Sequence, residues 1–203
     1  VAPEVPGSIS EGGELGYWAP PYVLPDKLVR ATLEIEDRYF YEHRGVRLPS
    51  VARAAWQNLR NGRVISGAST LAMQVARMQS PGERTLGRKV REMAEALLLI
   101  RAHGHEKVLR QYLTLAPYGN NTRGAVRAAR LYFDKPVEDL SWLQAAFLAA
   151  LPQSPGRMNP YEPGGLARAT RRARRILRML HARGVLDDEE LRLLTELGGD
   201  ILF

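Results

Sequence analysis

The segment spanning residues 67–101 most constrains the fold, because a Ser-Pro-Gly break separates two helical patterns within it. In the second pattern, Arg84, Arg88 and Arg91 recur at i, i+4 and i+7, so they share one face of a helix. Glu92 follows Arg88 by one helical turn and borders that face. The segment therefore predicts a long amphipathic helix in which guanidinium groups lie beside a carboxylate.

Two interpretations of this helix are open. Planar guanidinium forks bind phosphate oxygens well, so the row suits a phosphate-bearing ligand. The same row is typical of a solvated helix stabilised by i,i+4 ion pairs. The whole chain favours an anionic partner, because its net charge is +7 and 25 of its 29 basic residues are arginine. Such a partner is a nucleic acid, an acidic phospholipid or a phosphate-bearing substrate.

Length and composition indicate one folded domain. The chain has 203 residues and 45% hydrophobic residues, enough for a sizeable core. Cysteine is absent, which excludes a disulfide and a thiol nucleophile. No window approaches the ~18 apolar residues of a membrane span, and no signal peptide is recognised, so we expect any anchor to lie outside this sequence. We expect residues 1–25 to form an extended arm and residues 26–203 a single domain.

Hydrophobic periodicity and capping residues predict a mainly α fold, since no segment of useful length alternates with period two. His103 and His105 flank a glycine without the spacing of helical metal ligands, so we expect a loop there rather than a metal site. For the basic segment 166–183, packing against the core and binding to anionic lipid are both open. The predicted helices cover about 26–41, 49–61, 70–80, 84–101, 107–115, 124–133, 141–151, 166–183 and 187–198.

Two predicted helices each offer a carboxylate. Glu36 follows the apolar stripe of the first helix, where partial burial would make a carboxylate a better proton acceptor, although a frayed helix end is also possible. Paired carboxylates are typical of sugar chemistry. A glycosidase needs one as an acid, whereas a sugar on pyrophosphate leaves once cations neutralise its charge. The cations near Glu92 therefore favour transfer from a phosphate-activated donor over hydrolysis.

Five segments in order resemble the motifs of peptidoglycan glycosyltransferases (glycosyltransferase family 51), which form the transglycosylase domain of class A penicillin-binding proteins. Residues 36–45, EDRYFYEHRG, resemble ED-x-x-F-x-x-H-x-G. Residues 67–77, GASTLAMQVAR, resemble G-x-S-T-x-T-x-Q-x-x-K, with alanine and arginine in place of the second threonine and the lysine. Residues 88–96, RKVREMAEA, resemble R-K-x-x-E-x-x-x-A. The fourth and fifth motifs resemble segments 107–133 and 140–152.

This resemblance implies a lysozyme-like helical head with a smaller membrane-facing jaw lobe, which we place at roughly 45–67. It also implies polymerisation of lipid II, an undecaprenyl-pyrophosphoryl disaccharide-pentapeptide, with inversion at the donor carbon. Glu36 would be the general base on the acceptor 4-hydroxyl. Glu92 would help to hold the pyrophosphate, directly or through a divalent cation (Mg²⁺ or Mn²⁺), and no organic cofactor is expected. The implied substrate-binding residues are Asp37, His43, Arg53, Ser69, Thr70, Gln74, Arg77, Arg84, Arg88, Lys89 and Arg91.

The resemblance further implies partners and a location. We expect lipid II, the growing glycan strand and an anionic membrane surface as partners, moenomycin as an inhibitor, and no nucleic acid. The expected location is the periplasmic, extracytoplasmic face of the plasma membrane. A membrane helix and a transpeptidase domain are expected in the family but not found in this sequence, which suggests an excised domain or a free-standing variant. The alternatives are a lysozyme-like peptidoglycan hydrolase, a degenerate domain that binds lipid II or anionic lipid, and a basic nucleic-acid-binding protein.

Overall fold

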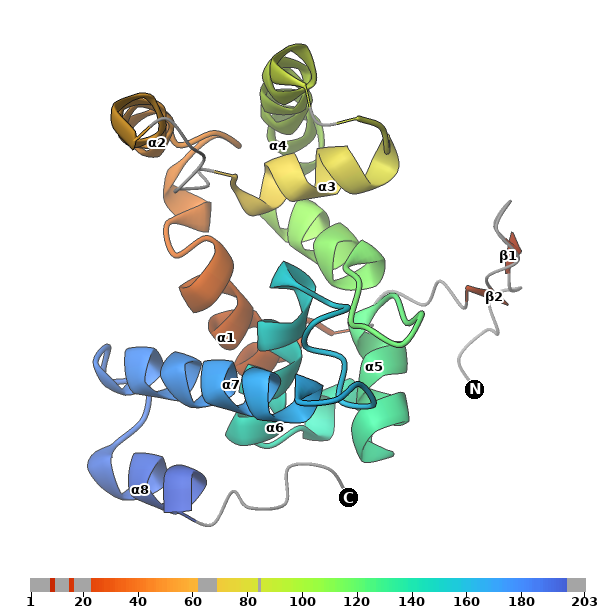
Figure 1. Ribbon diagram of the computed structural model, residues 1–203, viewed down its shortest axis with the longest axis vertical. Coiled ribbons are helices and arrows are strands. Elements are labelled where there is room, and N and C mark those ends of the chain that lie inside the picture. Colours follow the sequence, from red (N-terminus) through yellow and green to blue (C-terminus); the bar gives the residue numbers. More distant parts are fainter. Residues whose placement is uncertain (1–7, 10–14, 17–22, 62–68, 84, 197–203) are drawn as a thin grey trace. The chain divides into compact units, whose positions relative to one another are not determined.

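Helices dominate the computed structural model, in which two short strands, β1 (Ser8–Ile9) and β2 (Leu15–Gly16), pair in antiparallel fashion within the predicted arm (Figure 1). The mainly α prediction is therefore confirmed. None of the helices in the described part of the chain is both long and apolar enough to cross a bilayer. The structure describes residues 8–9, 15–16, 23–61, 69–83 and 85–196.

The chain divides into two compact units. The first contains Val1–Ile35 and Leu113–Phe203, and the second contains Glu36–Tyr112. The predicted jaw lobe begins within the second unit, but its residues 62–67 lie outside the described residues, so the division into head and jaw stays a prediction.

A nearly all-apolar helix, α6, lies in the core of the first unit. Ser141 and Gln144 form a capping box, in which the Ser141 hydroxyl accepts from the Gln144 amide at 3.2 Å and the Gln144 side chain accepts from the Ser141 amide at 3.0 Å. Seven residues of α6 are buried, which explains why its sequence shows no polar face. The helices of this unit are α1 (Asp26–Glu36, whose last residue belongs to the second unit), α5 (Ala125–Phe133), α6 (Trp142–Ala150), α7 (Gly165–His181) and α8 (Asp188–Glu196), with 3₁₀ turns η2 (Val137–Asp139) and η3 (Leu151–Gln153).

Helix α7 packs against α6 and also contacts α8 (Figure 1). Its apolar stripe is buried and contains Ala169, Ala173, Ile176, Leu177 and Leu180. Of the two interpretations of this basic segment, packing against the core is confirmed for the apolar face. The arginines lie on the remaining sides of the helix.

The second unit contains α2 (Leu48–Asn61), α3 (Leu71–Gln79), the turn η1 (Phe40–Glu42) and most of α4 (Leu86–Leu115). Gly104, at φ 75° and ψ 167°, kinks α4 where the sequence predicts a loop, so the interruption is shorter than expected. The first helix ends at Glu36 instead of near residue 41. The reason is that residues 37–42 form a tight turn, in which the Phe40 amide donates to the Asp37 carbonyl at 2.9 Å.

One close backbone approach fixes the start of α7. A Cβ added at Gly165 would lie 2.8 Å from the carbonyl carbon of Asn159 and closer still to its oxygen. We therefore expect Gly165→Ala to lower the free energy of unfolding by about 1–3 kcal/mol, because the loop has to shift. Urea denaturation measures this loss.

Gly87→Ala is the matched control, since a Cβ at that helical position would meet no atom within 4 Å. It is expected to raise the free energy of unfolding by about 0.5–1 kcal/mol, because alanine is the better helix former. Equal stability of the two variants would contradict the packing argument.

Candidate active site

Asp37 connects the turn after α1 to the start of α3. Its carboxylate accepts from the Leu71 amide at 2.9 Å and lies 3.0 and 3.1 Å from Nε2 of His43. Both side chains are buried, so these contacts are shielded from water. The N-terminus of α3, where the free backbone amides favour an anion, is therefore already occupied by a carboxylate of the protein.

The hydrogen bonds define the tautomer of His43. The Gly45 amide donates to Nδ1 of His43 at 3.1 Å, so Nδ1 acts as an acceptor. The ring proton is consequently on Nε2, which donates to Asp37. His43 is thus a neutral positioning residue with both ring nitrogens in use.

Gly45 brings the same turn against α3 and α4. Its carbonyl accepts from the Thr70 hydroxyl at 2.5 Å, while the Thr70 oxygen caps α3 by accepting from the Met73 amide at 3.2 Å. Gly45 has φ 106°, and an added Cβ would lie 2.7 Å from the carbonyl carbon of Ala96. A side chain at this position is therefore excluded by backbone conformation and by contact.

Glu36, the predicted base, is partly buried at the end of α1. The Gln74 side-chain amide donates to one of its carboxylate oxygens at 2.9 Å. This hydrogen bond helps to hold the carboxylate in one orientation, which suits a proton acceptor.

Glu92, the second predicted carboxylate, is buried with 5% of its surface exposed. It forms ion pairs with Lys89 at 3.2 Å and with Arg88 at 3.4 Å. Lys89 also donates to the Ser69 hydroxyl at 2.6 Å. Glu36 and Glu92 are therefore both connected to the segment 69–74, one through Gln74 and the other through Lys89 and Ser69.

The other predicted residues are placed less centrally. Arg91 is exposed and pairs with Glu95 at 2.7 Å. Arg53 lies exposed on α2 and Arg77 lies partly buried on α3. Among the described residues, neither of these two is joined to another predicted site residue by a hydrogen bond or ion pair. Arg84 lies outside the described residues, and the roles of all four arginines stay predictions.

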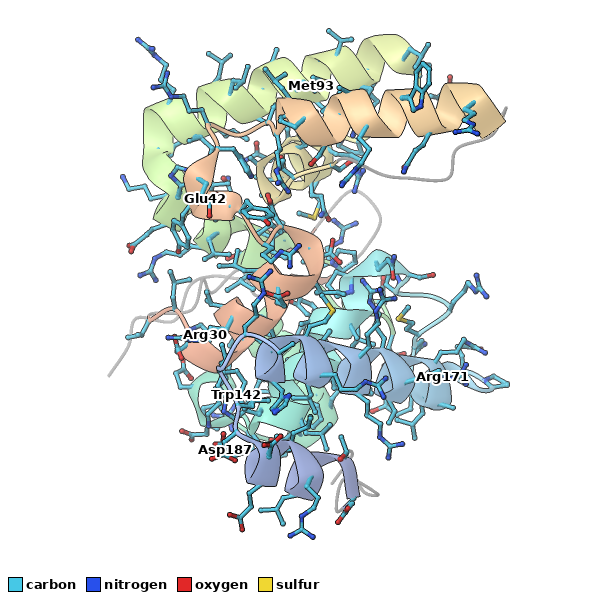
Figure 2. All side chains as sticks on the ribbon, turned by 90° about the vertical axis from the view of Figure 1, so that its left-hand side faces the viewer. Arg30, Glu42, Met93, Trp142, Arg171 and Asp187 are labelled. Atoms are coloured by element: carbon cyan, nitrogen blue, oxygen red, sulfur yellow. The ribbon has the colours of Figure 1, made fainter. Side chains whose placement is uncertain are left out.

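A cavity of about 490 Å³ lies beside the Asp37–His43 contact but includes neither Glu36 nor Glu92 in its lining. Glu42 and Met93, both labelled in Figure 2, line it. Its wall also contains Tyr39, with the Arg47 guanidinium 3.8 Å above the ring centre. This cavity therefore lies beside His43 and is not centred on the predicted base.

Comparisons with known proteins identify the family to which the chain belongs. Residues 9–181 match the family described as Transglycosylase. The chain belongs to the transglycosylase family. This family match confirms the prediction that the chain is an enzyme of peptidoglycan synthesis.

The similar curated proteins are penicillin-binding proteins. The chain is 40% identical to penicillin-binding protein 1C of Escherichia coli over 180 residues, which cover 87% of this chain and 23% of that protein. It is 35% identical to penicillin-binding protein 1B of E. coli over 191 residues, 92% of this chain and 22% of that protein. The transglycosylase thus spans less than a quarter of these relatives. The predicted resemblance to class A penicillin-binding proteins is confirmed.

The fold also matches a solved structure. The transglycosylase is similar to the 2.6 Å crystal structure of penicillin-binding protein 1A from Haemophilus influenzae, with a TM-score of 0.50 and 19% identity. The match covers 89% of this chain and 18% of that one. It supports the predicted lysozyme-like transglycosylase fold.

Sequence reasoning missed one residue that supports the site. His105 donates from Nε2 to the His43 carbonyl at 2.9 Å, and its ring packs edge-on to Phe40 with centres 5.2 Å apart. The sequence predicts only a loop at this position. His105 and His43 are 62 positions apart in the sequence, so no local sequence pattern predicts their contact.

We predict that Asp37→Asn lowers the free energy of unfolding by about 1–3 kcal/mol. An asparagine oxygen can replace one carboxylate oxygen, but its NH₂ group then faces the Nε2–H of His43. The histidine cannot change tautomer in response, because Nδ1 would then present a proton to the Gly45 amide. Urea denaturation measures the loss.

Asp26→Asn is the matched control, because Asp26 is exposed and, among the described residues, pairs only with Arg30 of α1, at 2.8 Å. We expect a change within about 0.5 kcal/mol for this variant. An unchanged stability of Asp37→Asn would contradict the assigned tautomer and network.

Proposed function

We propose that this transglycosylase polymerises lipid II into glycan strands by inverting transfer and releases undecaprenyl pyrophosphate. The observation that carries the proposal is the connection of Glu36 and Glu92 to one segment, 69–74, with the two cations Arg88 and Lys89 beside Glu92. A donor activated by pyrophosphate requires such an arrangement, because its leaving group needs cations and its acceptor needs a base.

Residues around Glu92 would bind the donor pyrophosphate. Arg88 and Lys89 bring two positive charges to one carboxylate, so the cluster keeps one excess positive charge. The Arg88 Nε lies 3.4 Å from Glu92, beyond ordinary hydrogen-bond length, and has no hydrogen-bond partner among the described residues. A phosphate oxygen would give this guanidinium a better acceptor.

Glu36 would activate the acceptor. Its carboxylate takes the proton of the acceptor 4-hydroxyl as that oxygen forms a bond to the donor anomeric carbon. The bond from that carbon to the pyrophosphate oxygen breaks, its electron pair leaves with the pyrophosphate, and attack from the opposite side inverts the configuration. Gln74 would hold the carboxylate in position during this step.

The residues around Glu92 do not by themselves fit a divalent cation. Both carboxylate oxygens face positive side chains. Among the described residues, no three histidine or acidic side chains gather as metal ligands. We therefore assign the neutralisation of the leaving group to Arg88 and Lys89, and no step above uses a metal.

This transglycosylase would act at the extracytoplasmic face of the plasma membrane. There it would meet lipid II, the growing strand and anionic lipid. Moenomycin would occupy the donor site.

We predict that Glu36→Gln lowers polymerisation by about 10²–10⁴-fold, because the acceptor loses its base. The assay incubates the purified chain with labelled lipid II, detergent and Mg²⁺, and separates the products on a gel. Glu138→Gln, the same change at an exposed site of the first unit, should keep the ladder of long glycan. Normal turnover by Glu36→Gln would reject the assigned base.

Two further readouts separate the alternatives. New reducing ends released from mature peptidoglycan would identify a hydrolase and reject the proposal. Moenomycin binding without any turnover in the presence of detergent and lipid would identify a binding domain and likewise reject it.

We predict that Arg88→Ala raises the KM for lipid II by about tenfold or more, since a charge-assisted contact to the donor is lost. Arg88→Lys should recover only part of this loss, because lysine lacks the planar fork. Arg101→Ala, at an exposed position of the same helix, serves as the control for α4. Equal KM values for Arg88→Ala and Arg101→Ala would contradict the donor role.

A further inference from the structure

A second basic site lies in the first unit, in a groove of about 510 Å³ between α7 and the turn that follows α6. Its volume is in the range of small-molecule sites, about 300–1,000 Å³. Figure 2 labels Arg171 on the α7 wall of this groove. The lining residues are Gln153, Ser154, Arg157, Met158, Arg168, Arg171, Arg172 and Arg175.

The charge in this groove is of one sign. Five of the lining residues are arginines, and no acidic residue is among the described residues that line it. Three of them, Arg157, Arg171 and Arg175, are exposed. Within the described part of the chain, no carboxylate forms an ion pair with any of these three. Their guanidinium groups therefore keep donors available to a ligand.

Hydrogen bonds from Arg168 join the two walls of the groove. Arg168 donates from Nε to the Arg157 carbonyl at 2.7 Å and from Nη2 to the Pro163 carbonyl at 3.0 Å. These bonds join α7 to the opposite wall, which is the turn that begins in η3. Arg168 thus has a structural role, since it fixes the two walls relative to each other. The other arginines of the lining surround the groove.

Sequence spacing explains why the charges converge. Arg168, Arg171 and Arg175 follow one another at i, i+3 and i+7 on α7, so they share a face. Like charges at these spacings repel one another, and a bound anion relieves that repulsion. The opposite face of α7 is anchored in the core by Ile176 and Leu177, so the helix cannot rotate the arginines apart.

We propose that this groove binds a ligand that carries at least two phosphate groups. Guanidinium forks match phosphate oxygens in geometry as well as charge. A single monoanion would neutralise only one of several adjacent cations, whereas a polyphosphate contacts several at once. The residues of this site are distinct from those around Glu92, and the inference does not rest on the proposed function.

The test measures binding of inorganic pyrophosphate by isothermal titration calorimetry at low salt. All proteins carry Arg88→Ala, which weakens the competing cluster around Glu92. In that background, Arg171→Gln with Arg175→Gln should raise the Kd by about tenfold or more. Arg171→Lys with Arg175→Lys should raise it less, because charge is kept but the planar fork is lost.

Arg101→Gln with Arg130→Gln is the matched control, because it removes the same two charges from exposed positions on α4 and α5. Its Kd should stay within about twofold of the background. An equal loss in the groove variant and the control would overturn the proposal, as would an unchanged Kd in the groove variant. Thermal denaturation of each variant verifies that it is folded.

A vesicle-binding experiment distinguishes a soluble phosphate ligand from a lipid headgroup. Sedimentation compares phosphatidylglycerol with phosphatidylcholine vesicles. Loss of pyrophosphate binding with unchanged binding to phosphatidylglycerol supports the site and assigns it a soluble ligand. Loss of both supports the site and assigns it a lipid headgroup. Loss of vesicle binding alone overturns the proposal, because it indicates a charged surface and not a phosphate pocket.

Discussion

The hydrogen bonds accepted by the Asp37 carboxylate hold together the part of the second unit on which the candidate active site depends. The Leu71 amide and His43 both donate to it, which places a negative charge at the positive end of α3. A buried polar network is stabilising only when every member is satisfied. The position of segment 69–74 is therefore set by polar geometry, which is far more directional than apolar burial.

This anchoring gives two chemically identical side chains different surroundings. Glu36 accepts a hydrogen bond from the Gln74 side chain, whereas Glu92 is buried beside Arg88 and Lys89. A carboxylate that organises cations suits the binding of a leaving group. This difference in surroundings is the local observation on which the proposed roles of the two carboxylates rest.

Local features of the fold were predictable from the sequence, whereas contacts across the chain were not. The Ser141–Gln144 capping box joins residues three positions apart, so their spacing in the sequence is enough to predict it. The contact of His105 with His43 depends on the tertiary fold, which no periodicity encodes. The early end of α1 was missed because its apolar pattern continues to Phe40, which is buried although it lies in a 3₁₀ turn.

The approach of Gly45 to α4 has a consequence for how this protein tolerates sequence change. The contact joins main chain to main chain, because a Cβ at Gly45 would meet the carbonyl group of Ala96. Substitutions along the outer surface of α4 leave such a contact intact, whereas any side chain at position 45 removes it. In a saturation mutagenesis map, this junction would be recorded as an intolerant position 45, whereas exposed positions on the outer surface of α4 would tolerate substitution.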